Sequence, residues 1–234
     1  MNKGKLYIIP TPLSGTDLNS TILPKDIEIV SNIKHFIVET PKIARSFLAS
    51  IPLSCPIQEI VMETYNEHSK PEFIQEIIQP LMTGEDMGLM TDAGTPCIAD
   101  PGEEIVLMCQ RVGIEVIPMI GPSSILLTLM GSGLNAEKFT FHGYLSRKTE
   151  QRKRELLDIA QMIRRNGSTQ IFIEAPYRNQ EIFNAILELP NELNLCLGIN
   201  IGSENSKILT QPISIWKSEN HILDKVPTIF LIGR

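Results

Sequence analysis

The sequence has few cysteines, and none is paired in a way that suits a metal site or a redox motif. The four are Cys55, Cys97, Cys109 and Cys196, and no two of them form a CxxC pair. The four histidines show no HExxH spacing, and none stands at zinc spacing from a cysteine. We therefore predict reduced, mostly buried thiols and no metal site.

Long apolar runs are also missing. No stretch approaches the roughly 20 apolar residues of a membrane span, and the first apolar run stops at Pro10, which is too short for a signal peptide. The formal net charge of −6 argues against a protein that coats itself with nucleic acid, although it leaves room for a local basic patch. We expect a soluble cytoplasmic protein that does not contact a membrane.

Three common enzyme motifs are absent as well. The sequence contains no GxxxxGK[ST] loop, which argues against a P-loop nucleotide enzyme. No GxGxxG follows the first apolar run, which weakens a nicotinamide-binding interpretation and the common glycine-rich methyltransferase loop. No GxSxG stands where a serine nucleophile would.

The order of apolar runs and helical patterns predicts an α/β fold. Strands are expected in the first half at residues 6–9, 35–39, 87–90 and 114–120, with an amphipathic helix at 71–82. This alternation is typical of a parallel βαβ series. Strands are expected in the second half at 139–144, 170–174, 195–201, 213–216 and 228–232, with helices at 150–165 and 179–189. Hairpins near the end predict a mixed sheet there.

The segment TDAGTPCIADPG, residues 91–102, is the most informative stretch. It follows a buried strand, turns through Gly94, Pro96 and Pro101, and precedes a helix. Gly94 allows the backbone to approach a ligand, and the prolines fix the shape of the loop. Loops at the carboxyl ends of parallel strands commonly bind small ligands. A structural strand-to-helix turn is the other interpretation of this segment.

Three further strand ends carry unusual loops: IPTPLSG at 9–15, IGPSS at 120–124 and EAPYR at 174–178. If their strands are neighbours, these loops meet at one rim. We therefore expect two small α/β domains, residues 1–119 and 120–234, with a ligand cleft between them. The loops offer backbone groups and hydroxyls with little charge, which favours an uncharged or zwitterionic ligand over a polyphosphate.

The order of IPTPLSG, YNEH, TDAGTP, IADPG, GPSS, GYLSRK and EAPYR is similar to that of the tetrapyrrole methylase superfamily. The chain most resembles the branch that methylates a cytidine ribose 2′-hydroxyl in 16S ribosomal RNA. The motifs are collinear from residue 5 to about residue 185. The resemblance implies class III methyltransferase domains, S-adenosylmethionine in the cleft, and a homodimer.

The resemblance also implies a set of cofactor contacts. The matching positions are Pro10, Leu13, Asp92, Gly94, Thr95, Pro96, Ile98, Ser123, Ser124, Tyr177 and Thr228. Tyr177 and Thr228 stand where the second domain of the family closes over the adenine.

Methyl transfer to a ribose hydroxyl requires alignment of the reactants and help with removal of a proton. Glu39 ends a predicted strand and so points toward the rim, which makes it our catalytic candidate. Glu67 with His68, and Asp100, are the other candidates. Asp100 also suits a purely structural turn before Pro101.

A basic segment is the best clue to the substrate. Residues 147–165 hold seven basic and three acidic side chains, a net charge of +4 on an acidic chain. Such a segment favours contact with RNA phosphates, and we expect Arg147, Lys148, Arg152 and Lys153 to make it. A solvated helix face with i,i+4 ion pairs is the alternative.

The chain departs from the branch at the substrate rim. The branch reads PIGN where this chain has Leu13-Ser14-Gly15, and EDTR where it has Glu39-Thr40-Pro41-Lys42. Residues 198–216 also lack the expected Arg-Glu-x-Thr-Lys pattern. These changes spare most of the cofactor loops, which indicates retained methyl-donor binding with a substrate that has drifted.

Three functions remain open. The leading one is an S-adenosylmethionine-dependent methyltransferase that acts on a ribose 2′-hydroxyl of small-subunit ribosomal RNA. The second is a methyltransferase for a small molecule such as a tetrapyrrole. The third is a non-catalytic S-adenosylmethionine-binding protein.

Overall fold

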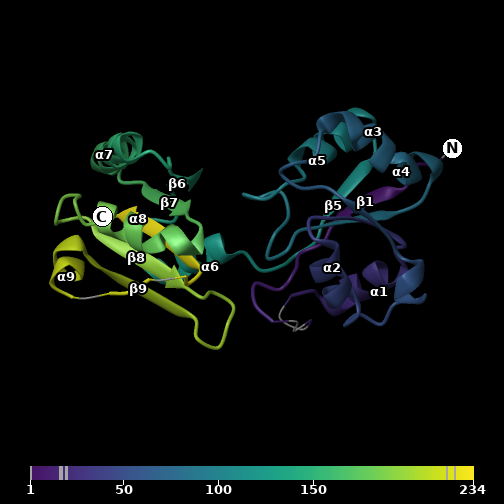
Figure 1. Ribbon diagram of the computed structural model, residues 1–234, viewed down its shortest axis with the longest axis horizontal. Helices are drawn as coiled ribbons and strands as arrows, with labels where there is room; N and C mark the ends of the chain where they lie inside the picture. Colours follow the sequence, from purple (N-terminus) through teal and green to yellow (C-terminus); the bar gives the residue numbers. More distant parts are fainter. Residues whose placement is uncertain (1, 16–17, 19–20, 220, 224) are drawn as a thin grey trace. The chain divides into compact units, whose positions relative to one another are not determined.

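The chain forms two compact units, Met1–Ser123 and Ser124–Arg234, in the computed structural model. The structure describes residues 2–15, 18, 21–219, 221–223 and 225–234. The domain boundary expected from the sequence, after residue 119, precedes this division by one loop. Each unit is built around its own sheet (Figure 1).

The first unit contains a five-stranded sheet in the order β3-β2-β4-β1-β5. All four strand pairings are parallel, as predicted for the first half. The strands are β1 (Lys5–Ile8), β2 (His35–Val38), β3 (Val61–Thr64), β4 (Met87–Met90) and β5 (Glu115–Pro118). The helices are α1 (Pro24–Asn32), α2 (Pro41–Leu48), α3 (Ile74–Ile77), α4 (Gln79–Thr83) and α5 (Glu103–Arg111), with 3-10 turns at Ile57–Glu59 and Pro71–Phe73.

Alternation along the strands gives this unit two cores. Side chains point alternately to opposite faces of a strand, so Leu6 and Ile8 join the cluster that includes Ile105, whereas Tyr7 belongs to the cluster that includes Phe47. Helices α3 and α5 lie on one side of the sheet, and α1 and α2 lie on the other (Figure 1). The sheet is therefore covered on both faces, as parallel sheets usually are.

The prediction of one continuous helix at 71–82 is wrong. The segment instead forms a 3-10 turn at Pro71–Phe73 followed by the short helices α3 and α4. Pro80 lies in the first turn of α4, where its missing N–H costs no helical hydrogen bond. A helix that continued from residue 71 through Pro80 would lose one hydrogen bond at this proline. The strand Val61–Thr64 was not predicted, because its side chains are mostly exposed and form no apolar run.

The second unit contains a mixed sheet in the order β6-β7-β10-β8-β9. β6 and β7 are parallel, and the remaining pairs are antiparallel, including the β8–β9 hairpin. The strands are β6 (Phe139–Tyr144), β7 (Thr169–Ile173), β8 (Asn194–Ile199), β9 (Lys207–Pro212) and β10 (Thr228–Gly233). The helices are α6 (Ser124–Ser132), α7 (Thr149–Asn166), α8 (Asn179–Ile186) and α9 (Ile213–Ser218), with a 3-10 turn at Pro176–Arg178.

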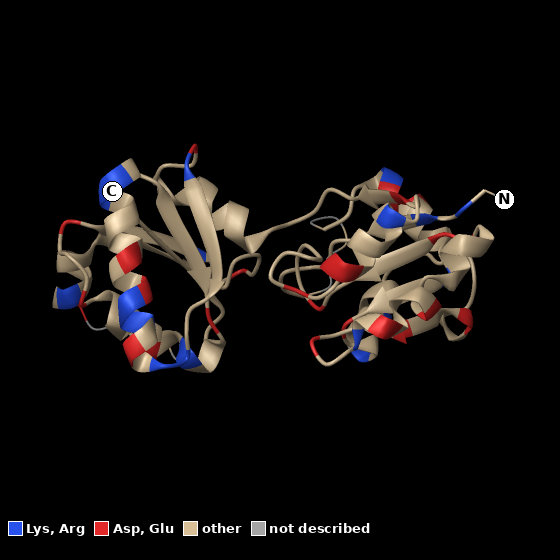
Figure 2. Cartoon of the chain, turned by 90° about the horizontal axis from the view of Figure 1, so that it is seen from above, with Lys and Arg blue, Asp and Glu red and all other residues tan. Residues whose placement is uncertain are grey.

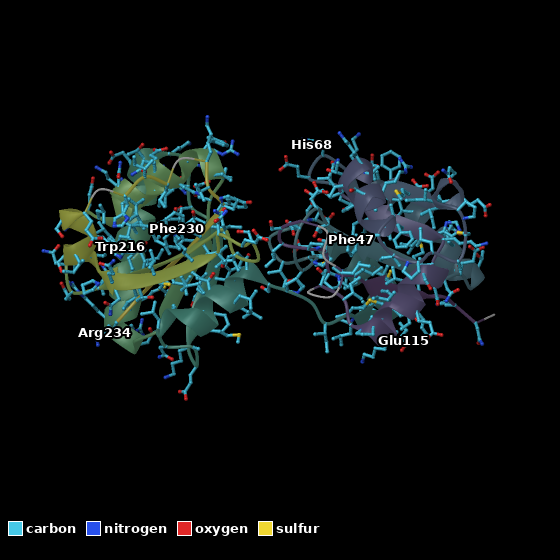
Figure 3. All side chains as sticks on the ribbon, turned by 90° about the horizontal axis from the view of Figure 1, so that it is seen from below. Phe47, His68, Glu115, Trp216, Phe230 and Arg234 are labelled. Atoms are coloured by element: carbon cyan, nitrogen blue, oxygen red, sulfur yellow. The ribbon has the colours of Figure 1, made fainter. Side chains whose placement is uncertain are left out.

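The strand expected at 213–216 is also wrong, because this segment begins α9. Ile213 and Trp216 are three positions apart and so lie on one face of this helix. Both are fully buried in the larger core of the unit. The Trp216 indole N–H donates to the Leu195 carbonyl at 2.9 Å, which fixes α9 to β8. Figure 3 shows Trp216 and Phe230 inside this unit and Phe47 inside the other.

Helix α6 packs so closely on the second sheet that two glycines are needed. A Cβ atom at Gly198 would lie 2.2 Å from the Thr128 hydroxyl, and one at Gly131 would lie 2.5 Å from the Ile208 Cδ1. Leu129 from α6 shares a small core with Cys196 of β8. The helix is thus part of the second unit, although it directly follows the GPSS loop.

The close approach of α6 predicts the effect of Gly198→Ala. The added methyl group should lower the free energy of unfolding by about 1–3 kcal/mol, as overpacking does. Thr128→Ala removes the two nearest atoms, so the double variant should be less destabilised than the sum of the single variants. Chemical denaturation measures all four free energies. Additive losses would show that Gly198 and Thr128 do not constrain each other.

Candidate functional site

The loops that follow β1, β4 and β5 are joined to one another at the carboxyl edge of the first sheet. Thr11 and Gly94 exchange backbone hydrogen bonds at 2.9 Å and 3.1 Å, which pairs the loop after β1 with the loop after β4. The Thr95 hydroxyl donates to the Pro122 carbonyl at 3.1 Å, which adds the loop after β5. Three of the sequence-predicted loops therefore do form one rim within this unit.

Glycines make this rim possible. Gly94 has a φ of 84°, in the left-handed region that favours glycine. A Cβ atom at Gly121 would lie 2.1 Å from the Cβ of Pro10, so only glycine allows these two loops to touch. Pro10 is buried in the contact, and Leu13 lies beside Gly94.

The segment after Pro96 is strained. Cys97 and Ala99 both have left-handed backbones, with φ of 66° and 65°, although neither is glycine. Backbone strain of this kind costs about 1–3 kcal/mol per residue and gathers at ligand-binding segments. Ile98, between them, is 49% exposed, so an apolar side chain is held out toward solvent at the rim.

Two acidic side chains lie between β2 and β4. The Asp92 carboxylate accepts two hydrogen bonds from Thr40, one from its N–H at 3.1 Å and one from its hydroxyl at 2.7 Å. The Asp92 N–H in turn donates to Glu39 Oε2 at 3.3 Å. Thr40 replaces the Asp of the EDTR motif described above. Its hydroxyl bonds Asp92, whereas a second carboxylate at this position would repel Asp92. No pattern in the sequence indicates this role of Thr40.

Burial changes the acidity of this group. Partial burial, then the nearby charges of Glu39 and Asp92, raises the pKa of Asp100 to about 6, against the lowering effect of the nearby Thr91 hydroxyl. Burial is also the main cause of a raised pKa at Glu39, followed by the opposing hydrogen bond from the Asp92 N–H. A raised pKa makes a carboxylate a better proton acceptor at neutral pH, so both residues suit a basic role.

The third candidate base lies elsewhere on this unit. His68 lies 3.5 Å from Glu67, and both side chains are more than four-fifths exposed. His68 lines a pocket of about 530 Å³ at the end of β3, together with Glu63, Phe73 and Ile77. Exposure leaves this pair without the desolvation that acts on Glu39 and Asp100.

The other predicted contacts lie at the boundary of the two units and in the second unit. Ser123 ends the first unit and Ser124 begins α6 in the second. Tyr177 is 66% exposed in the turn Pro176–Arg178, whereas Thr228 is buried at the start of β10 and donates its hydroxyl to the Val226 carbonyl at 2.9 Å. Asn179 donates to the same carbonyl, which ties the Tyr177 turn to the start of β10.

The basic residues of the GYLSRK segment divide into two groups. Arg147, Lys148 and Lys153 are exposed, and blue Lys and Arg positions are interspersed with red Asp and Glu positions along α7 (Figure 2). Arg152 is only 2% exposed and pairs with Glu181 of α8. Of the four predicted phosphate contacts, the structure places three at the surface and one in the interior.

Neither a metal cluster nor a membrane-spanning helix is present in the part of the chain that the structure describes. No group of three or more His, Cys, Asp or Glu side chains in this part of the chain could hold a metal ion. No described helix has the length and apolar character needed to cross a membrane.

The sequence matches one protein-family model. The model for Tetrapyrrole (Corrin/Porphyrin) Methylases covers residues 5–215. Curated relatives share the similarity: the ribosomal RNA small subunit methyltransferase I of Vibrio cholerae is 29% identical over 97% of this chain and 76% of its own length. The protein of that name from Synechocystis is 32% identical over 75% of this chain and 58% of its own length.

Solved structures share the fold. The methyltransferase CobJ has a TM-score of 0.65 at 11% identity, with 99% of this chain and 94% of that chain covered. A uroporphyrin-III C-methyltransferase from Thermus thermophilus, solved with S-adenosyl homocysteine, has a TM-score of 0.59 at 15% identity, with 99% and 98% covered. The two-unit α/β architecture is therefore that of this group of methyltransferases.

The raised pKa of Asp100 predicts a pH-dependent effect of Asp100→Asn. Because the folded state binds this proton more tightly than the unfolded state, wild-type stability falls as pH rises from 3.8 to about 6. The Asn variant lacks this fall. Relative to wild type, its melting temperature should be roughly 2–4 °C higher at neutral pH than at pH 4.

Calorimetry at both pH values tests this, with the exposed Asp158→Asn of α7 as the control. An Asp100→Asn variant whose melting temperature differs from wild type by the same amount at both pH values would contradict the assigned burial effect.

Proposed function

Because the chain belongs to the tetrapyrrole methylase family and is an S-adenosylmethionine-dependent methyltransferase, we propose that its acceptor is a ribose 2′-hydroxyl of small-subunit ribosomal RNA. The observation that carries this proposal is the combination of an ordered, weakly charged rim in the first unit with exposed cations in the second. The curated relatives whose names specify small-subunit ribosomal RNA support it. An RNA of this kind places the protein in the cytoplasm.

The rim residues fit the cofactor. S-adenosylmethionine supplies an activated methyl group on a sulfonium when bound. Gly94, Thr95 and Pro96 offer backbone groups and a hydroxyl, and Pro10, Leu13 and the exposed Ile98 offer apolar surface. Asp92 orders the rim through Thr40, and its negative charge suits a cationic donor. Ser123, Ser124, Tyr177 and Thr228 are proposed as further contacts because they match the family's motif positions. The serines carry hydroxyls, Tyr177 has an exposed aromatic ring, and Thr228 is buried at the start of β10.

Glu39 is proposed to accept the proton of the ribose hydroxyl. Its Oε2 is held by the Asp92 N–H at 3.3 Å, which leaves its other oxygen for the acceptor. Its raised pKa favours uptake of a proton. Asp100 is proposed to keep the site negative behind Glu39, which favours a protonated product carboxyl. Catalysis otherwise consists of holding the two reacting atoms close and in line.

Arg147, Lys148 and Lys153 are proposed to contact RNA phosphates. All three are exposed, and Lys153 makes only a long 3.8 Å ion pair with Glu188. Exposed pairs of this length contribute little energy, so the ammonium group remains available to a phosphate. Arg152 is left out of this surface because its guanidinium is already bonded inside the unit.

A homodimer is proposed through α6. Met130 is 79% exposed and Leu127 is 38% exposed, on a helix whose opposite side is buried. Apolar side chains gathered on one helix face commonly mark an association surface.

Gly94→Ala should weaken cofactor binding through the rim. The variant forces a Cβ into a left-handed backbone and against Leu13, which lies 3.0 Å from the Cβ position. We expect at least tenfold weaker binding of S-adenosylhomocysteine by calorimetry, or about 1.4 kcal/mol. Gly113→Ala is the matched control, since Gly113 also has a left-handed φ, of 70°, but lies before β5 at the other edge. Equal losses in both variants would contradict a specific role for Gly94.

Methyl transfer tests the proposed acceptor. The protein, tritiated S-adenosylmethionine and small ribosomal subunits from a strain lacking this gene should give label in ribosomal RNA. The double variant Lys148→Gln/Lys153→Gln should raise KM about tenfold. The dependence of KM on salt should also become shallower, because RNA binding releases fewer counterions when two phosphate contacts are lost.

Lys25→Gln/Lys34→Gln, on exposed positions of the first unit, is the matched control and should leave KM unchanged. Label in a tetrapyrrole and none in RNA would favour the small-molecule function. Cofactor binding without label in any acceptor would favour a non-catalytic protein.

A further inference from the structure

Four side chains of the second unit form a chain of alternating charge. Arg152 of α7 pairs with one oxygen of Glu181, and Arg178 Nε lies 3.9 Å from the other. Arg178 Nη2 lies 3.3 Å from Glu174 at the end of β7. The side chains of Arg152, Arg178 and Glu174 are 3%, 11% and 2% exposed, whereas that of Glu181 is 52% exposed. Glu181 is therefore the joint between two buried arginines.

One end of this chain holds the basic loop between β6 and α7. Arg152 Nη1 donates to the carbonyl of Ser146 at 3.3 Å and to that of Arg147 at 3.4 Å. The Ser146 N–H donates to Glu155 at 2.8 Å, and the Lys148 N–H donates to the Ser146 hydroxyl at 3.2 Å. The loop backbone thus bonds inward, while the Arg147 and Lys148 side chains remain exposed.

The other end holds the turn that presents Tyr177. Glu174 Oε1 accepts from the Ala175 N–H at 2.8 Å, and the Arg178 N–H donates to the Ala175 carbonyl at 2.8 Å. These bonds close the turn around Tyr177 and leave its ring exposed. The same chain of charges therefore contacts the proposed RNA loop at one end and the proposed adenine turn at the other.

We propose that Arg152 and Glu181 are positioning residues: Arg152 holds the loop that carries Arg147 and Lys148, and Glu181 joins this loop to the Tyr177 turn. The inference rests on the proposed function for the identity of the two ligands. Arg152 acts through the planar fork of its guanidinium, which reaches two carbonyls and a carboxylate together. Lysine has the same charge but lacks that fork, so it cannot replace Arg152.

This role differs from direct phosphate contact in a measurable way. At a phosphate contact, lysine would serve as a point charge nearly as well as arginine. If Arg152 instead positions the loop, Arg152→Lys should weaken RNA binding. The substitution releases the loop, whose cations must then be ordered when RNA binds. Once the loop is released, removal of the charge of Lys148 should weaken RNA binding less than it does in the wild type.

Binding of a labelled oligouridylate by the full chain, measured by fluorescence anisotropy, tests the role of Arg152. We expect about tenfold weaker binding for Arg152→Lys and for Lys148→Gln. The double variant should be only slightly weaker than either single variant, because the two residues act through one loop. Arg111→Lys, at the exposed end of α5 in the first unit, is the matched control and should bind as wild type does. Thermal unfolding confirms that each variant is folded at the temperature used.

Calorimetry with S-adenosylhomocysteine tests the role of Glu181. Glu181→Gln keeps the size of the side chain but removes the charge that both arginines share. It should weaken oligouridylate binding about tenfold and S-adenosylhomocysteine binding about threefold. Arg152→Lys should leave S-adenosylhomocysteine binding unchanged, since the bond between Glu181 and Arg178 remains. A general loss of structure would weaken both ligands in both variants.

The inference is overturned if Arg152→Lys binds oligouridylate as wild type does, if the losses from Arg152→Lys and Lys148→Gln add, or if wild type does not bind oligouridylate. It is also overturned if Glu181→Gln leaves either affinity unchanged. These readouts do not require methyl transfer. A wild-type chain that shows the binding pattern but transfers no methyl group to RNA would refute the proposed function and leave the positioning role standing.

Discussion

The backbone pairing of Thr11 with Gly94 is the contact on which the rest of the proposed site depends. It joins loops from adjacent parallel strands, and it requires the left-handed backbone that glycine adopts without strain. Gly121 allows the third loop to reach Pro10. Because these contacts exist before a ligand binds, little conformational entropy is lost when the rim takes up a cofactor. The rim is thus preorganised by its own backbone contacts.

The two sheets serve different chemical needs. The parallel sheet gathers the loops that follow its strands at one edge, which suits a small ligand that must be held in a fixed orientation. The mixed sheet supports α7 and α8 on one face, and the buried Arg152 of α7 pairs with Glu181 of α8 and bonds the backbone of the loop that carries exposed cations. An acidic protein can in this way present a local cationic surface to a polyanion. At the rim of the first unit, the Thr40 hydroxyl donates to Asp92 and so holds this carboxylate in place.

Local patterns predicted most of the fold but not the contacts that complete it. Met87–Met90 and Phe139–Tyr144 were predicted with their observed bounds, because each is a short apolar or aromatic run next to turn residues. The edge strands Val61–Thr64 and Lys207–Pro212 were missed, since exposed strands lack such a run. The rim loops were predicted from glycine and proline positions. The burial of Arg152 could not be predicted, because its partner Glu181 is 29 residues away and the charge pattern of α7 looks solvent-facing.

Nucleoside analysis of ribosomal RNA tests the central claim most directly. Small-subunit RNA from cells with and without this gene is digested to nucleosides and compared by mass spectrometry. The account predicts that one 2′-O-methylated nucleoside is lost without the gene and returns when the purified protein and S-adenosylmethionine are added to the subunits. Identical nucleoside profiles in the two strains, with no methyl group gained on addition of the protein, would contradict it.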